Sequence, residues 1–280
     1  MGVRLKDYLQ RIRYEGPVKP NFECLKKVHR HQALSVPYEN LDIQLQRPVD
    51  QDIERIFDKI VKKKRGGWCF ELNGLLDWAL REIGFDVTRC LAGILRNERG
   101  DTILGNHLVL LIQLDDVYLA DLGLGDGIRE PIPIKPGIYV QNDLVFRLET
   151  LDDGYWRFHN HGFGYPTPFD FKTIPADEQL IAGKCHLLQH APESIFVQNL
   201  VCQIMTINSV TCLTGQVLRY KTSRGTSKKL LNSAEELVNT LAEVFGIQDP
   251  SAKLVWPRVR QRHIELFGEQ RIDEIEVSGF

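Results

Sequence analysis

The chain has no excess of positive charge and no long apolar segment. Its 280 residues include 35 Lys and Arg against 37 Asp and Glu, which gives a formal net charge of -2. Proteins that bind duplex nucleic acid neutralise phosphates with a basic field, so we expect no nucleic-acid partner. No run of 18 apolar residues occurs, and the charged N-terminus lacks the apolar centre of a signal peptide. We therefore expect neither a membrane span nor a membrane partner.

Cysteine is scarce and dispersed. The six cysteines stand at positions 24, 69, 90, 185, 202 and 212, and none forms a C-x-x-C pair. Zinc sites and disulfide-rich scaffolds concentrate their cysteines at short, regular spacings. We therefore expect no metal, and the pattern favours reduced thiols in a cytoplasmic protein.

The hydrophobic pattern changes its period along the chain, which indicates an α+β fold. Up to about residue 85 apolar residues recur at helical spacing, most clearly over 52–62. Segments 86–96, 106–114 and 117–122 are then β-rich and separated by turn residues. Further along we predict a hairpin (144–149 with 155–159), a helix (176–190), paired strands (195–207 with 210–221) and a second helix that opens at Ser233 and ends at Gly246.

Residues 65–73, with the sequence RGGWCFELN, place one thiol where a glycine turn becomes a helix. Gly66 and Gly67 permit a sharp turn, and Cys69 then falls in the first helical turn. Unpaired backbone N–H groups at that position favour a thiolate, and Arg65 adds positive charge nearby. Cys69 is therefore either an activated nucleophile or, as for most free cysteines, a small buried hydrophobe.

An imidazole and a carboxylate stand on neighbouring predicted strands. His107 opens the strand 106–114, and Asp121 ends the strand 117–122. If residues 115 and 116 form a two-residue hairpin turn, position 114 pairs with 117 and Asp121 faces residue 110, three residues from His107. A longer loop would bring the carboxylate nearer. A thiol, an imidazole and a carboxylate together make a chemically coherent nucleophilic triad.

The stretch 36–43, with the sequence VPYENLDI, is predicted to be extended. Its polar and aromatic side chains, Tyr38 among them, could line a cleft. The alternative is a buried connector that satisfies its own backbone, and the sequence leaves both open.

Four segments together resemble the arylamine N-acetyltransferase family in order and spacing: 36–43, 65–73, 107–111 and 121–125. The Arg-Gly-Gly-aromatic-Cys signature lies in the second, and the resemblance extends to about residue 250. It implies a papain-like arrangement, of the cysteine proteinase superfamily, with three domains. These are a helical N-terminal domain over 1–85, an antiparallel β-barrel over 86–194 and an α/β lid over 195–280.

The resemblance also implies the chemistry. A triad of Cys69, His107 and Asp121 takes an acetyl group from the co-substrate acetyl-CoA as a cysteine thioester. It then passes that group to an arylamine, a hydrazine or an N-hydroxyarylamine in a ping-pong reaction. No metal takes part.

The chain departs from the family pattern at one position after the aspartate, where Leu124 replaces the usual Phe. The loss of an aromatic wall predicts altered acceptor or donor preference, and Tyr38 and Leu124 are the expected substrate contacts. By similarity Thr206 is a candidate CoA contact. Gly105, close to His107, allows the donor to approach.

Three other functions use similar residues. Papain-like proteases and transglutaminases share the triad, and amide synthases are close relatives with carrier-bound acyl donors. In a different class, the protein could be a thiol redox sensor or a non-catalytic binding module, although a complete triad argues against that interpretation.

Overall fold

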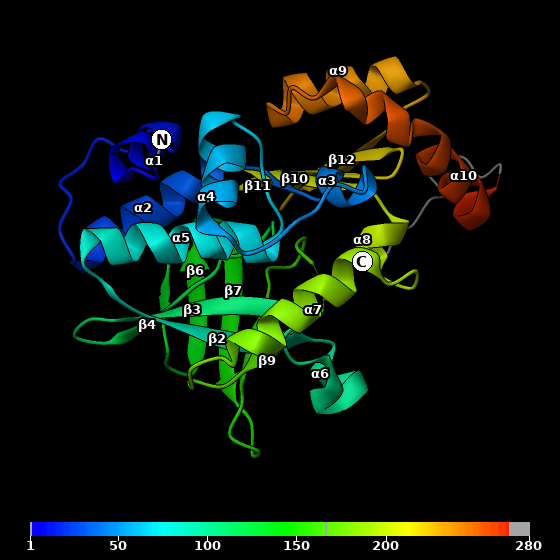
Figure 1. Cartoon of the computed structure of the whole chain (residues 1–280). Coiled ribbons are helices and arrows are strands. Elements are labelled where there is room, and N and C mark those ends of the chain that lie inside the picture. Colours follow the sequence, from blue (N-terminus) through cyan, green and yellow to red (C-terminus); the bar gives the residue numbers. More distant parts are fainter. Residues whose placement is uncertain (1, 166, 269–280) are drawn as a thin grey trace.

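The computed structural model describes residues 2–165 and 167–268, so the end of the predicted lid, 269–280, lies outside the described residues. Figure 1 shows three groups of elements: helices from the first part of the chain, a barrel of strands beneath them, and a C-terminal lobe that carries α9 and α10. In the described ranges none of the helices combines the length and apolar character that crossing a bilayer requires.

The first 85 residues are mainly helical, as predicted. The helices are α1 (Leu5–Arg11), α2 (Phe22–Ser35), α3 (Leu41–Gln44), α4 (Ile53–Phe57), a π-helix (Asp58–Lys62) and α5 (Cys69–Ile83). The Asn21 side chain accepts a hydrogen bond from the Cys24 N–H and caps α2. Gly84, with φ +101°, ends α5 in the left-handed conformation that glycine tolerates.

An eight-stranded antiparallel sheet follows, in the order β5-β4-β3-β2-β9-β8-β7-β6. Its strands are β2 (Asp86–Ile94), β3 (His107–Gln113), β4 (Val117–Ala120), β5 (Ile132–Pro133), β6 (Gly137–Gln141), β7 (Leu144–Thr150), β8 (Trp156–His159) and β9 (Phe169–Phe171). The Tyr139 hydroxyl of β6 lies 2.6 Å from the Lys135 carbonyl and 3.1 Å from the Pro133 carbonyl of β5, and so joins the two edge strands. The sheet thus forms a nearly closed barrel. Two short helices, α6 (Arg96–Arg99) and a 3-10 helix (Gly100–Ile103), connect β2 to β3.

The register of the β3–β4 hairpin differs from the prediction by one residue. Gln113, not Leu114, pairs with Val117. The loop therefore has three residues, and the Leu114 N–H donates to the Asp116 carbonyl across 2.9 Å. This shift brings Asp121 one residue closer to His107 than the two-residue turn predicted.

A second antiparallel sheet has the order β1-β10-β11-β12-β13. Its strands are β1 (Tyr38–Glu39), β10 (Val201–Met205), β11 (Ser209–Thr214), β12 (Val217–Thr222) and β13 (Gly225–Leu230). The predicted strands 195–207 and 210–221 are wrong in two respects. Residues 195–198 form the short helix α8 (Ile195–Gln198), and 210–221 is a hairpin that turns at Gly215, where φ is +56°.

The remaining helices precede and follow strands β10 to β13 in the chain. They are α7 (Glu178–His190), α9 (Ala234–Phe245), a 3-10 helix (Pro250–Val255) and α10 (Trp256–Phe267). Ser233 caps α9 by accepting from the Glu236 N–H, and Gly246 ends it with φ +69°, as predicted. Figure 1 shows α7 crossing in front of the barrel toward the C-terminal lobe.

Asn40 joins the first part of the chain to the second sheet. Its side-chain amide donates to the carbonyls of Phe196 and Asn199, at 2.9 and 2.8 Å, and its oxygen accepts from the Val201 N–H at 2.8 Å. The side chain is 2% exposed. The extended stretch around Asn40 is therefore partly a buried connector, one of its two predicted roles.

We expect Asn40→Ala to lower the free energy of unfolding by about 2–4 kcal/mol, because the buried Val201 N–H and the part-buried Asn199 carbonyl lose their side-chain partner. Urea denaturation measures this value. Asn208→Ala, at an exposed position of the β10–β11 turn, is the matched control and should change it by less than about 0.5 kcal/mol. Equal stability of the two variants would contradict the role given to Asn40.

Candidate active site

Cys69 is the first residue of α5, and its side chain is 2% exposed. The helix start is capped by Glu71, whose carboxylate accepts from the Trp68 N–H at 3.2 Å. Burial raises the pKa of the Cys69 thiol well above its usual value, although the Phe70 N–H acts in the opposite direction. The resting thiol is therefore protonated, and its reactivity depends on a neighbouring base.

His107 and Asp121 form a buried pair. His107 Nε2 lies 2.9 Å from Asp121 Oδ2, and the two residues are 1% and 3% exposed. Burial opposes ionisation of Asp121, but His107, Asn73 and the Gly123 N–H outweigh burial and hold its pKa below the usual value. An ionised carboxylate on Nε2 leaves Nδ1 as the free ring nitrogen. The sequence prediction that the imidazole and the carboxylate meet is confirmed.

Cys69 and His107 line the same cavity, which has a volume of about 420 Å³. The structure therefore brings the thiol, the imidazole and, behind it, the carboxylate into one accessible place. Such a set can form and resolve a covalent acyl intermediate.

Asn73 holds these groups together, and its function was not recognised from the sequence. Its Nδ2 donates to Asp121 Oδ1 at 2.8 Å and to the Leu108 carbonyl at 2.6 Å, while its Oδ1 accepts from the Leu122 N–H at 2.8 Å. Asn73 lies four residues after Cys69, on the same face of α5. This four-residue spacing is the sequence feature that could have identified Asn73 as a residue of the site.

Glycines near Cys69 serve close packing. A Cβ on Gly123 would lie 2.8 Å from Cys69 Cβ and 2.8 Å from Asn73 Nδ2, so only glycine fits there. A Cβ on Gly66 would lie 2.2 Å from the Pro37 carbonyl oxygen. Neither Gly66 nor Gly67 has a positive φ, so lack of space for a Cβ, and not a left-handed conformation, accounts for these two glycines. They let the chain before Cys69 lie against β1.

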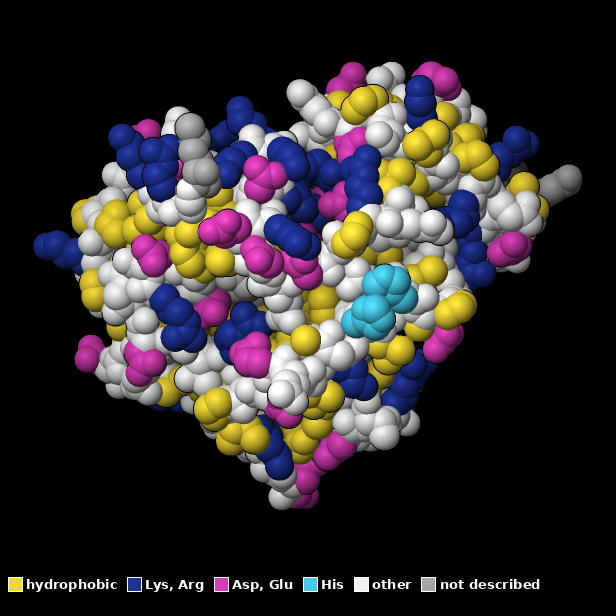
Figure 2. Space-filling view, in the orientation of Figure 1, with side chains coloured by type: hydrophobic (Ala, Val, Ile, Leu, Met, Phe, Trp, Pro, Cys, Tyr) yellow, Lys and Arg dark blue, Asp and Glu magenta, His cyan; other side chains and the backbone are white. Residues whose placement is uncertain are grey.

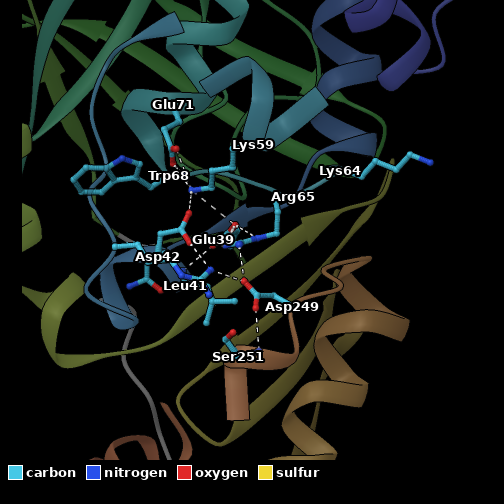
Figure 3. A network of polar contacts seen from close by, with 12 residues as sticks. Glu39, Leu41, Asp42, Lys59, Lys64, Arg65, Trp68, Glu71, Asp249 and Ser251 are labelled. Carbon is cyan, nitrogen blue, oxygen red and sulfur yellow. Dashed lines mark hydrogen bonds and ion pairs between the residues drawn. The ribbon is translucent and has the colours of Figure 1, made fainter. Parts of the chain in front are cut away.

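Arg65 does not supply charge to the thiol, contrary to the prediction. Its guanidinium donates to Glu39 Oε1 at 3.0 and 2.7 Å, and it pairs with Asp249 at 3.0 Å. Lys59 joins Glu71 and Asp42, at 2.8 and 2.9 Å. Figure 3 shows these side chains as one network beside Trp68. The network fixes the turn before Cys69 to β1, to α3 and to the C-terminal lobe through Asp249.

Two of the four candidate binding residues line the cavity, and two do not. Tyr38 and Leu124 belong to its wall. The Thr206 hydroxyl lies 2.6 Å from the Ser209 hydroxyl in the β10–β11 turn, outside the residues that line the cavity. Gly105 has φ +86° and packs against Lys184 rather than on the cavity. CoA contacts at Thr206 and Gly105 stay predictions.

His29 hydrogen-bonds to the backbone of Asp121. Its Nε2 accepts from the Asp121 N–H at 3.2 Å, and its Nδ1 lies 3.1 Å from the Arg129 carbonyl. A carbonyl only accepts, so Nδ1 carries the proton and the ring is neutral. Burial lowers the pKa of His29 to about 4.

Comparisons with known proteins agree along most of the chain. A family model described as N-acetyltransferase matches residues 21–254. The chain is 34% identical to the arylamine N-acetyltransferase of the Gallus gallus pineal gland, isozyme NAT-3, over 87% of this chain and 93% of that protein. It is 33% identical to arylamine N-acetyltransferase 1 of Bos taurus, over 76% and 82% respectively.

Solved structures give the same result. The arylamine N-acetyltransferase from M. tuberculosis has a TM-score of 0.83 and 27% identity, and covers 93% of this chain and 100% of that chain. The Mycobacterium marinum arylamine N-acetyltransferase in complex with CoA has a TM-score of 0.81 and 26% identity, with coverage of 92% and 99%.

We expect His29 to make the protein less stable in acid. An unfolded histidine takes up a proton near pH 6.5, whereas folded His29 stays neutral down to about 4. Acid therefore favours the unfolded chain, and the free energy of unfolding should fall as the pH decreases through this range. In His29→Gln the fall between pH 7 and 4.5 should be smaller by about 2–3 kcal/mol. Urea denaturation at both pH values tests this, and an unchanged pH dependence would contradict it.

Proposed function

The chain belongs to the arylamine N-acetyltransferase family, and from that premise we propose a ping-pong reaction through a Cys69 thioester. The acetyl group comes from acetyl-CoA, and the acceptor is the nitrogen of an arylamine, a hydrazine or an N-hydroxyarylamine. One observation carries the proposal: Cys69 and His107 line one cavity while Asp121 holds the far side of the imidazole.

In the first half-reaction the Cys69 sulfur attacks the thioester carbonyl, and His107 Nδ1 takes the thiol proton. The bond from the carbonyl carbon to the CoA sulfur breaks, and His107 returns the proton to the leaving thiolate. Backbone N–H groups at the start of α5, that of Phe70 among them, stabilise the oxyanion. Because burial disfavours a resting thiolate, the proton leaves Cys69 as the new bond forms.

In the second half-reaction the acceptor amine attacks the Cys69 thioester, and His107 takes a proton from its nitrogen. The carbon–sulfur bond breaks, and Cys69 recovers the proton. Asp121 keeps its place and its charge throughout and fixes the tautomer of the imidazole. Its hydrogen bonds from Asn73 and Gly123 support that role.

The cavity wall supports the proposed substrates. Its apolar members include Tyr38, Leu124 and Phe196, which suit an aromatic acceptor. Arg99 also lines the cavity and is exposed, so its guanidinium can meet a phosphate of the donor. All six cysteines are unpaired, which supports the cytoplasmic setting proposed for this chemistry.

We expect the wild-type protein, mixed with acetyl-CoA alone, to gain the mass of one acetyl group. Cys69→Ala should gain none, because the acyl-accepting sulfur is gone. Intact-protein mass spectrometry reads both results. Cys90→Ala, which removes another buried thiol, is the control and should still be acetylated.

Acetylation of Cys69→Ala would remove the proposed nucleophile. A wild-type protein that acetyl-CoA does not modify, but that cleaves peptides or accepts an acyl group only from a carrier protein, would instead favour the protease or the amide synthase. Labelling of Cys69 by iodoacetamide without any acyl transfer would favour a thiol sensor.

We expect Asp121→Asn to slow single-turnover acetylation by roughly 10³–10⁴-fold, because the amide favours the wrong imidazole tautomer. Stopped-flow release of CoA measures the rate, and circular dichroism checks that the fold is kept. Asp115→Asn, an exposed change in the β3–β4 loop, is the matched control and should react at the wild-type rate. Near-normal acetylation of Asp121→Asn would exclude the proposed role of Asp121.

A further inference from the structure

Two exposed histidines share one face of α7, away from the triad. His186 and His190 are the one pair four residues apart among the eight histidines of the chain. Their ring centroids lie 4.3 Å apart, with 30° between the ring planes. Figure 2 shows histidine side chains, in cyan, adjoining on the surface over α7. Residues four apart on a helix can bind one ion together.

A hydrogen bond prepares one of these rings for coordination. His190 Nδ1 lies 2.8 Å from the His186 carbonyl oxygen. The carbonyl accepts, so Nδ1 carries the proton and Nε2 presents a lone pair. Histidines that bind metals usually donate their second ring N–H to a carbonyl or a carboxylate in this way.

Other histidines are occupied differently. His107 and His159 face the carboxylates of Asp121 and Glu149, at 2.9 and 2.7 Å. His161 is buried, and its Nε2 lies 2.9 Å from the Asp126 carbonyl. The exposed pair on α7 is therefore the place where two neighbouring imidazoles are accessible to an ion from solvent.

We propose that His186 and His190 form a two-imidazole site for a late first-row divalent ion, namely Zn²⁺, Ni²⁺ or Cu²⁺, with water in the remaining positions. Imidazole suits these ions, whereas Mg²⁺ and Ca²⁺ prefer oxygen ligands. The proposal is independent of the acetyl-transfer mechanism.

The position of the pair gives the site a structural consequence. His190 is the last residue of α7, and Leu187 and Leu188, in the same turn, line the catalytic cavity. The wall continues directly into Ala191 and Ser194. An ion that bridges the two rings fastens this last turn, and so stabilises one wall of the cavity from outside.

Calorimetric titration of untagged protein with ZnCl₂ and NiCl₂ tests the site. We use a Cys69→Ala background, so that the nucleophilic thiol cannot bind the metal. One ion should bind. His186→Gln or His190→Gln should each weaken binding at least about tenfold, because removing even a residue that only hydrogen-bonds to a metal ligand lowers metal affinity by about that factor. His263→Gln, on α10, is the matched control and should leave affinity unchanged, and MgCl₂ should not compete.

Two further measurements test separately the coordination by two imidazoles and the stabilisation of the last turn of α7. The electron paramagnetic resonance spectrum of bound Cu²⁺ should show coupling to two imidazole nitrogens, and to one in either single variant. Zn²⁺ should slow amide hydrogen exchange over 186–190 in the parent but not in His186→Gln. Unchanged metal affinity in both variants would overturn the site. Metal binding without slower exchange would overturn the fastening of α7.

Discussion

The packing of one amide side chain, Asn73, on the helix that carries Cys69 is the constraint on which the reactive centre depends. Helix geometry fixes Asn73 one turn from the thiol. Its three hydrogen bonds then fix the Asp121 loop and the backbone at Leu108, next to His107. Gly123 permits this because a side chain there would collide with Cys69 itself. The thiol and the carboxylate, from elements far apart in sequence, are thereby held at a set separation.

The charged side chains around the turn before Cys69 have a structural function. Arg65 and Glu71 are buried, Lys59 is 13% exposed, and each pairs with opposite charge within 3.0 Å. Breaking a buried pair leaves an uncompensated charge, so such a network strongly favours one arrangement of the turn before Cys69. Asp249 extends that constraint to the C-terminal lobe. Burial of the Cys69 sulfur disfavours its thiolate, and this explains why the proposed reaction needs His107 to remove the thiol proton.

Elements from different parts of the chain pack together around the cavity. β1 belongs to the first 85 residues but pairs with β10, and Leu41 lies in the same apolar core as α9. α7 has a similar double position, because its inner face lines the cavity while its outer face carries the histidine pair. A change in the C-terminal lobe can therefore reach the cavity wall through packed elements.

Local chemistry was enough to predict the helix start at Cys69, the strands that carry His107 and Asp121 and the family resemblance, because capping, periodicity and motifs depend on neighbouring residues. Tertiary structure decided four other features: the partners of Arg65, the role of Asn73, the hairpin within 210–221 and the cavity walls. Arg65 and Asp249 are 184 positions apart, and contacts over such distances leave no periodic signal in one sequence. Only folding brings such groups together, and burial then decides which of them are charged.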